Sequence, residues 1–135
     1  MAQRILVADE LAPEGLEALK ASGMQYDEKV GLTAEQLAAE VGNYDALIVR
    51  SKAKVPAKVL ANPGKLRIIA RAGVGVDTID LEAATAKGIL VINTAAASTL
   101  STAEHALALM FALARKITGG HAHVMAGPDK WSSSA

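Results

Sequence analysis

The amino-acid sequence predicts an α/β protein with a flavodoxin-like, doubly wound sheet of five parallel strands. Short continuous apolar segments rich in Ile, Val and Leu alternate with amphipathic segments, at intervals of roughly 20 to 25 residues. Strands that are apolar along their whole length need cover on both faces, which parallel sheets obtain from right-handed helical crossovers. For five such strands the simplest spatial order is 2-1-3-4-5.

The strands are predicted from apolar runs of four to six residues, several of them β-branched. The first run ends at an acidic residue, Asp9, and the second rests only on the spacing of Met24, Tyr26 and Val30. The five predicted strands are Arg4–Asp9, a segment within Met24–Val30, Asp45–Arg50, Leu66–Arg71 and Ile89–Asn93.

The helices between these strands are predicted from their start and stop residues. Pro13 opens a helix over residues 13–22, before Gly23. The sequence Thr33-Ala-Glu-Gln36 fits a capping box, in which two side chains satisfy backbone donors, and a helix over 34–41 follows. The remaining predicted helices are Pro56–Leu60 and Asp80–Lys87, the second of which is closed by Gly88.

The last predicted helix differs because it is apolar on every side between Ala106 and Ala114. It begins at a second capping box, Ser101-Thr-Ala-Glu104, and ends at Arg115 and Lys116, whose charges suit a helix C-terminus. A helix that is apolar all round needs cover all round, from a second subunit or another domain. We therefore expect a sheet domain over 1–98, this helix and an irregular segment packed on the sheet or a partner over 99–127, and a mobile tail over 128–135.

Composition excludes several classes of function. A chain of 135 residues has room for one domain, and its 14 basic and 14 acidic residues cancel, which argues against nucleic-acid and anionic-membrane partners. The apolar run over 106–114 is about half of the ~20 residues that a membrane-spanning helix needs. The absence of cysteine and of a signal peptide pattern predicts a cytoplasmic protein.

Candidate binding residues follow the third, fourth and fifth strands, because ligands of such folds gather at the carboxyl ends of the strands. The three candidate ranges are Arg50–Lys52, Arg71–Asp77 and Asn93–Ser98. Arg50-Ser51-Lys52 offers two cations and a hydroxyl, a combination that holds phosphate, although a solvated basic loop has the same composition. Gly73-Val-Gly-Val76 offers main-chain amides to an anion. The alternative for this segment is a tight turn that needs positive backbone angles at glycine.

The sequence predicts neither catalytic residues nor a metal site. Gly73-Val-Gly is not a dinucleotide fingerprint, since Thr78 stands where the third glycine belongs. His121 and His123 have the spacing of two metal ligands on a strand, but no carboxylate or thiol cluster accompanies them, and surface histidines in a flexible region are the alternative. His105 has no evident orienting acid.

Five motifs in a fixed order give the sequence a family resemblance over about Arg4 to Trp131. They resemble those of the D-isomer-specific 2-hydroxyacid dehydrogenases, and in particular of the members that oxidise 3-phosphoglycerate. The motifs are Val49-Arg-Ser-Lys52, Arg71-Ala-Gly-Val-Gly-Val-Asp-Thr-Ile-Asp80, Leu81-Glu-Ala-Ala-Thr-Ala-Lys-Gly88, Val91-Ile-Asn-Thr94 and Ser101-Thr-Ala-Glu-His105.

The resemblance implies a two-domain enzyme of serine biosynthesis that moves hydride between NAD and C2 of 3-phosphoglycerate, the carbon that carries the hydroxyl. On that basis Arg50, Ser51 and Lys52 hold the substrate phosphate. The backbone of Gly73, Val74, Gly75 and Val76 receives the substrate carboxylate, and Val74 also lies near the cofactor. The helix Ser101–Lys116 becomes the crossover to the nucleotide-binding domain and a homo-oligomer interface.

Three departures from the family pattern limit this expectation. The sequence stops where the family continues into its Gly-x-Gly-x-x-Gly turn and its catalytic arginine, glutamate and histidine, so the resemblance implies a substrate-binding portion with no NAD site that is inactive alone. The family's Asn-Thr-Pro-Gly-x-Asn reads Asn93-Thr-Ala-Ala-Ala-Ser98 here, so Ser98 replaces a substrate-binding asparagine and 3-phosphoglycerate binding is expected to be weak or lost. Ser132–Ser134 stand where relatives tend to carry a basic residue after the tryptophan.

Two other functions stay open from sequence alone. An engineered or stand-alone flavodoxin-like fragment without catalytic function is the first, because the alanines 95–97 look like a replaced turn. A flavin or nucleotide carrier is the second. The acidic pair Asp9-Glu10 after the first strand argues against a carrier, because a phosphate there meets like charge.

Overall fold

The computed structural model describes residues 3 to 127. The chain divides into a first unit that ends at Ala97 and a second that begins at Ser98. The first unit contains the sheet and its helices, and the second contains two further helices. The tail predicted over 128–135 lies outside the described residues.

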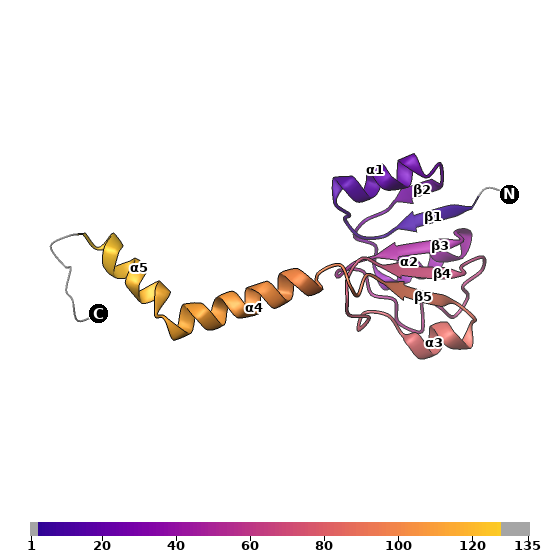
Figure 1. Ribbon diagram of the computed structural model, residues 1–135. Coiled ribbons are helices and arrows are strands. Elements are labelled where there is room, and N and C mark those ends of the chain that lie inside the picture. The colour runs from indigo at the N-terminus through magenta and orange to yellow at the C-terminus, as the bar shows by residue number, and fades with distance from the viewer. Residues whose placement is uncertain (1–2, 128–135) are drawn as a thin grey trace. The chain divides into compact units, whose positions relative to one another are not determined.

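The first unit is built on five parallel strands in the order β2-β1-β3-β4-β5, which confirms the predicted fold class (Figure 1). The register aligns Val49 at the end of β3 with Arg71 at the end of β4, and Arg71 with Asn93 at the end of β5. The carboxyl ends of three strands therefore meet at one rim of the sheet. The strands are β1 (Arg4–Val7), β2 (Gln25–Glu28), β3 (Ala46–Val49), β4 (Ile68–Arg71) and β5 (Leu90–Asn93).

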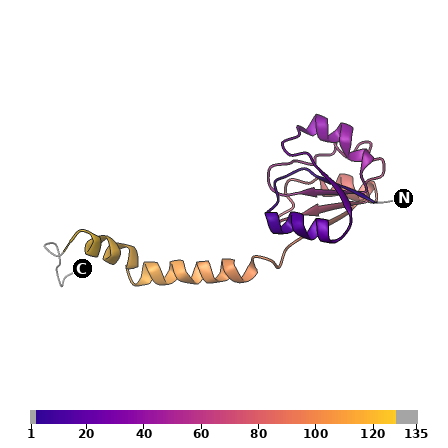
Figure 2. The same ribbon diagram turned by 90° about the horizontal axis from the view of Figure 1, so that it is seen from above.

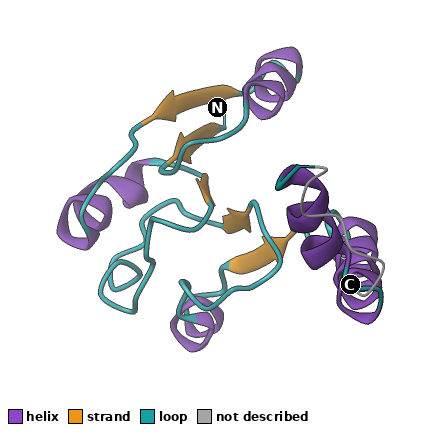
Figure 3. Ribbon diagram, turned by 90° about the vertical axis from the view of Figure 1, so that its left-hand side faces the viewer, coloured by secondary structure: helices purple, strands orange, loops and turns teal. Residues whose placement is uncertain are grey.

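Helices cover the two faces of this sheet unequally. Helix α1 (Pro13–Ala21) lies on one face, whereas α2 (Ala34–Glu40) and α3 (Leu81–Ala86) lie on the other, as Figures 2 and 3 show. The main core lies on the α2 and α3 side. Its strand residues include Leu6, Leu47, Val49 and Ile69, which pack with Leu37 of α2, Ala84 of α3 and the buried loop residues Val55, Val59, Leu60 and Ile79.

The α1 face has less cover. Helix α1 buries none of its own residues, and three apolar strand residues, Ile68, Leu90 and Ile92, remain exposed. They belong to β4 and β5, the two strands farthest from β2 in the sheet order. Within the first unit, helices therefore cover both faces of the sheet at β1 but not at β5.

The structure confirms one of the local sequence signals between the strands and contradicts another. The capping box at α2 is present, because Thr33 Oγ1 accepts from the Gln36 N–H and Gln36 Oε1 accepts from the Thr33 N–H. The predicted helix Pro56–Leu60 is wrong, because the segment is a turn. Its two backbone hydrogen bonds join residues three positions apart, from the Val59 N–H to the Pro56 carbonyl and from the Leu60 N–H to the Ala57 carbonyl. Val59 and Leu60 are buried, so their side chains rather than helical bonding fix this segment.

The second unit consists of α4 (Thr99–Ala114) and α5 (Ile117–Met125). The capping box predicted at Ser101 is wrong, because α4 already begins at Thr99 and Ser101 lies inside it. The irregular structure predicted after Gly119-Gly120 is also wrong, because α5 runs through both glycines and includes His121 and His123. Lys116, with a left-handed φ of 50°, separates the two helices.

Apolar side chains are exposed along α4, among them Leu107, Met110, Phe111 and Leu113. Helix α4 buries none of its residues. Over residues 3–127, no helix combines the length and the apolar character that crossing a membrane requires.

Gly64 lies at a close approach of two backbone segments. It has a φ of +56°, and a Cβ built on it would lie 2.7 Å from the Cα of Gly42. We predict that Gly64→Ala destabilises the fold by roughly 3 kcal/mol or more, from left-handed strain plus overlap with rigid backbone.

The matched control is Gly23→Ala. Gly23 has a similar φ of +72° with open space around the Cβ position, so its cost is about 1 kcal/mol of strain alone. Urea unfolding of both variants measures the difference, and equal losses would mean that the Gly42 contact does not constrain the fold.

Candidate functional site

The structure brings the two predicted anion-binding segments together at the carboxyl rim of the sheet. Arg50, Ser51 and Lys52 follow β3 directly and are exposed. Gly73 to Val76 follow β4, the neighbouring strand. The Ala72 N–H donates to the Val49 carbonyl at 2.9 Å, and Arg71 Nε donates to the Arg50 carbonyl at 2.7 Å. These bonds fix the two loops side by side.

The loop after β4 presents main-chain donors at this rim. Within the described residues, the N–H groups of Val74, Gly75 and Val76 donate to no protein acceptor. The Gly73 N–H does have one, the Arg71 carbonyl at 2.9 Å. Three successive amides without acceptors are the donor set that an anion-binding concavity of backbone uses. The available amides are therefore those of residues 74–76 rather than of all four predicted residues.

The side chain at the end of β5 and the backbone of the next residue hold this amide loop in place. Asn93 Nδ2 donates to the Val74 carbonyl at 2.6 Å, and the Thr94 N–H donates to the Gly73 carbonyl at 3.1 Å. The Gly73 and Val74 carbonyls are thus engaged by Thr94 and Asn93, and the Val76 carbonyl accepts from the Ile79 N–H at 3.0 Å. These bonds leave mainly the donors of the loop for a ligand.

Neither glycine of this loop is required by a special backbone angle, and only Gly75 lies in a crowded position. Neither Gly73 nor Gly75 has a positive φ, so the alternative of a left-handed tight turn is wrong. A Cβ on Gly75 would lie 2.8 Å from Asp77 Oδ1 and 3.1 Å from a terminal nitrogen of Arg71. The guanidinium of Arg71, whose side chain is only 11% exposed, lies where a larger residue would extend.

Asp9 is a site residue that sequence reasoning identified only as the acidic end of a strand. It is 3% exposed, and its carboxylate accepts from the Arg50 N–H at 2.6 Å and from the Ala53 N–H at 3.0 Å. It thereby clamps the base of the Arg50-Ser51-Lys52 loop. An acidic residue at the carboxyl end of a central strand was the available signal, but its partners are more than 40 positions away.

The space between the loops after β1 and β3 is small. A cavity of about 30 Å³ is lined by Asp9, Glu10, Arg50, Ser51 and Lys52, which is room for about one water molecule. Lys52 Nζ forms an exposed ion pair with Glu10 at 3.2 Å, which contributes little to stability. A ligand of this rim therefore lies on the surface and meets water on its other side.

The other residues considered from the sequence, Ser98 and the three histidines, are in the second unit. Ser98 belongs to the second unit, where it precedes α4 and makes no side-chain cap. His105 lies in α4, and His121 and His123 lie in α5. Among the described residues, no three His, Asp or Glu side chains are close enough to hold a metal ion.

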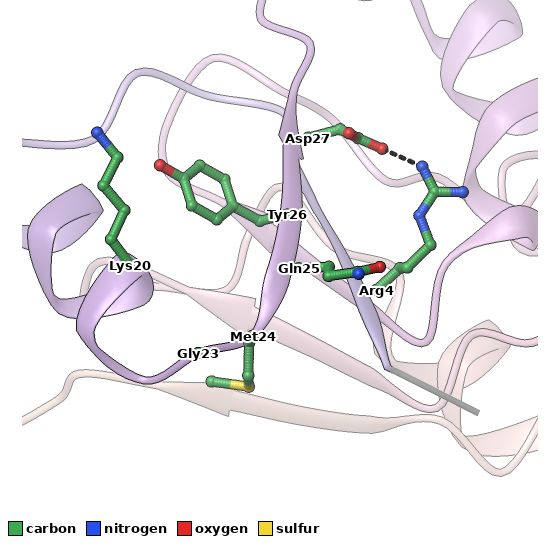
Figure 4. A pocket seen from close by; sticks show the side chains of 7 residues that line it. All are labelled: Arg4, Lys20, Gly23, Met24, Gln25, Tyr26 and Asp27. Atoms are coloured by element: carbon green, nitrogen blue, oxygen red, sulfur yellow. Dashed lines mark hydrogen bonds and ion pairs between the residues drawn. The ribbon is translucent and has the colours of Figure 1, made fainter.

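A larger hollow of about 660 Å³ lies along β2, at the edge of the sheet. Figure 4 shows that its side chains do not converge, because Lys20 and Tyr26 lie on one side of the β2 ribbon and Arg4 and Asp27 on the other. The Arg4 guanidinium is already paired with Asp27. We conclude that the size of this hollow reflects an open sheet edge rather than a built binding site.

Charge at this edge is organised around Tyr44, which is buried. Its hydroxyl donates to Asp27 Oδ2 at 2.8 Å and, together with the Arg4 guanidinium, lowers the pKa of the Asp27 carboxyl. Burial, and then the bond to Asp27, raises the pKa of Tyr44 itself. The bond to Glu40 raises the pKa of Lys29, whose ammonium lies 5.9 Å from the centre of the Tyr44 ring.

We predict that Tyr44→Phe raises the pKa of Asp27 toward the ordinary aspartate value of about 3.9. A carboxyl with a lowered pKa in the folded state adds stability above its ordinary pKa and loses that contribution as pH falls through the lowered value. The stability gap between wild type and variant is therefore largest near pH 7 and narrows below about pH 4. Carboxyl NMR titration and thermal unfolding measure both effects, and a gap that widens in acid would contradict a stabilising bond from Tyr44 to the ionised Asp27.

Comparison with known proteins identifies the family. Residues 5–134 match the family described as D-isomer specific 2-hydroxyacid dehydrogenase, catalytic domain. The chain therefore belongs to the D-isomer-specific 2-hydroxyacid dehydrogenases, which confirms the resemblance based on the five motifs.

Individual relatives show to which proteins of this family the chain is similar. The chain is 45% identical over 128 residues to D-3-phosphoglycerate dehydrogenase of Archaeoglobus fulgidus, and 43% identical over 129 residues to the human protein of the same name. These alignments cover 95% and 96% of this chain but only 24% of each relative. The chain thus spans about a quarter of the length of these curated relatives.

Solved structures agree with the fold. A Pyrococcus horikoshii protein matches all of the chain and 40% of its own length, with a TM-score of 0.84 and 30% identity. NAD⁺-bound 3-phosphoglycerate dehydrogenase of Entamoeba histolytica matches 70% of the chain and 33% of its own length, with a TM-score of 0.63 and 29% identity.

Proposed function

We propose that this chain is the substrate-binding portion of an NAD-dependent 3-phosphoglycerate dehydrogenase of serine biosynthesis, located in the cytoplasm. The observation that carries the proposal is the side-by-side placement of a basic loop, Arg50–Lys52, and three amides without acceptors, Val74–Val76, at one rim. 3-Phosphoglycerate carries an anionic group at each end. Two adjacent anion-binding loops of different donor type suit such a molecule.

The two loops have different roles in this proposal. Arg50 and Lys52 supply charge and the Ser51 hydroxyl supplies a donor, so this loop takes the phosphate. The neutral amides of residues 74–76 take the carboxylate, whose lower charge needs less compensation. C2, which carries the hydroxyl and the hydrogen that leaves as hydride, then lies between the loops on the solvent side of the rim, where hydride transfer requires a nicotinamide.

Within residues 3–127, the glycine loop does not continue as a dinucleotide-binding turn. The loop with Gly73 and Gly75 leads into a bridge between Val55 and Ile79 before α3 begins at Leu81, whereas a dinucleotide fingerprint passes from its glycine turn directly into a helix. Val74, which is 50% exposed, is proposed only to touch the cofactor. We therefore propose that the 135-residue polypeptide does not catalyse hydride transfer alone.

Weak substrate binding is the first expected result. A ligand held on one side only keeps much of its water, so we predict a Kd for 3-phosphoglycerate on the order of millimolar for the 135-residue polypeptide, and no binding of NADH at similar concentrations. Arg50→Ala and Lys52→Ala should each weaken 3-phosphoglycerate binding about tenfold or more, because each removes a charged donor to the phosphate. Calorimetry at low ionic strength measures these constants.

The matched control for the charge change is Lys65→Ala. Lys65 is exposed and precedes β4, at the amino end of the strands, so its loss removes the same charge without touching the rim. Equal weakening by Lys65→Ala would show a diffuse electrostatic effect, and micromolar affinity for NADH would show that the cofactor site has been misplaced.

We further propose that the chain forms a homo-oligomer through the helix predicted over Ser101–Lys116. The exposed Leu107, Met110, Phe111 and Leu113 support this, since an apolar helix surface of this extent is rarely left in water. The same helix is expected to cross to the nucleotide-binding domain in the family.

Light scattering tests the oligomer. We predict that the wild-type polypeptide has at least twice the monomer mass and that Phe111→Glu shifts it to monomer, because a carboxylate in an apolar interface loses its hydration. Thr102→Glu places the same charge at a polar position of α4 and should leave the mass unchanged. A wild-type monomer at high concentration would contradict the proposal.

A further inference from the structure

Charged side chains from both neighbouring strands hold the backbone of Arg50. Its N–H donates to Asp9 Oδ2 at 2.6 Å, and its carbonyl accepts from Arg71 Nε at 2.7 Å. Asp9 follows β1 and Arg71 ends β4, and these are the two strands that flank β3 in the sheet. Both backbone hydrogen-bonding groups of Arg50 are therefore fixed, whereas Arg50 itself remains exposed.

Asp9 also fixes the far end of the same loop. The N–H of Ala53, a buried residue, donates to both carboxylate oxygens of Asp9, at 3.0 and 3.1 Å. Between these anchored ends, the N–H groups of Ser51 and Lys52 have no protein acceptor within the described residues. The loop is thus rigid at its base, and its polar tip faces outward with its donors available.

These contacts come at an energetic cost that an apolar residue would avoid. Asp9 is 3% exposed and Arg71 is 11% exposed, and a buried charged group is unfavourable unless hydrogen bonds compensate it. Asp9 is the only residue with a charged side chain that is buried among residues 3–127. The bonds that compensate it go to the backbone of one loop, so its effect is to fix the position of that loop.

We propose that Asp9 and Arg71 are positioning residues, which fix the backbone of Arg50 and so aim the Arg50-Ser51-Lys52 loop at the substrate phosphate. This inference rests on the function proposed above, because it assigns that loop to the phosphate. Neither residue needs to touch the substrate. Binding groups act well only when their supporting contacts hold them within a fraction of an ångström.

The test uses Asp9→Asn and Arg71→Leu in the 135-residue polypeptide, with 3-phosphoglycerate as the probe. Asp9 Oδ2 accepts from both Arg50 and Ala53, and Oδ1 accepts from Ala53 as well. Asparagine removes the negative charge that strengthens these bonds, and with its oxygen at the Oδ2 position its Nδ2 donor faces the Ala53 N–H. Leucine removes the donor to the Arg50 carbonyl and keeps an apolar side chain among the loops. We expect each variant to raise the Kd about tenfold or more.

The matched control is Val41→Ala. Val41 begins the short 3₁₀ helix η1 (Val41–Asn43) before β3, at the amino end of the strands, and is fully buried. This variant should lower the melting temperature as a core truncation does and leave the Kd unchanged. The control therefore distinguishes an effect of the loop's position on binding from an effect of lower protein stability.

A readout without ligand accompanies the binding constants. Slow hydrogen exchange at the Ala53 N–H is expected in wild type and in Arg71→Leu, and faster exchange in Asp9→Asn, because only Asp9 accepts from that group. The second variant keeps the test decisive if the first does not fold.

The outcomes distinguish this inference from the proposed function. Unchanged Kd values in the folded variants, with a wild type that binds 3-phosphoglycerate, overturn the positioning role and leave the function standing. Failure of the wild type to bind 3-phosphoglycerate overturns the proposed function and the inference together. A Kd raised equally in Val41→Ala also overturns the inference, since stability alone would then explain the loss.

Discussion

The parallel direction of all five strands is the constraint on which the rest of the structure depends. It brings the residues after β1, β3, β4 and β5 to one rim, where they exchange hydrogen bonds across the strands. Asp9, Arg50 and Arg71 are far apart in the sequence and adjacent only because β3 lies between β1 and β4. A single antiparallel strand among these would move its loop to the opposite rim and separate the basic loop from the amide loop.

The chemistry of the rim follows from which groups are already engaged. Carbonyls of Arg50, Gly73 and Val74 accept bonds from neighbouring strands, and the amides of residues 74–76 do not donate to the protein within the described residues. The surface is therefore rich in donors, which suits an anion. Because the chain is electrically neutral overall, this local arrangement rather than net charge must attract the ligand.

Sequence patterns predicted the fold because strands that are buried in the sheet appear in the sequence as short apolar runs. The apolar runs indicated the strands, and the position of Arg50 and Gly73 directly after such runs predicted a shared rim. Asp9 was identified only as an acidic strand end and Arg71 only as the first residue of a candidate range, because their hydrogen-bond partners are 21 to 44 positions away and depend on strand order and register. No local pattern carries that information.

The errors in the helices have a similar origin, since the capping box at Ser101 fits a helix start although α4 begins two residues earlier. Gly119-Gly120 suggested an irregular segment, yet both glycines lie within α5, because the helix-propensity loss of about 1 kcal/mol per glycine is a preference and not a prohibition.

Amide chemical-shift mapping with 3-phosphoglycerate tests the central claim most directly, since it reports every rim amide at once. We predict that the largest shifts fall on Ser51, Lys52 and the amides of residues 74–76, and that they saturate together. Shifts that gather instead on Lys20 and Tyr26 along β2, or that bypass the loop after β4, would contradict a substrate site at this rim.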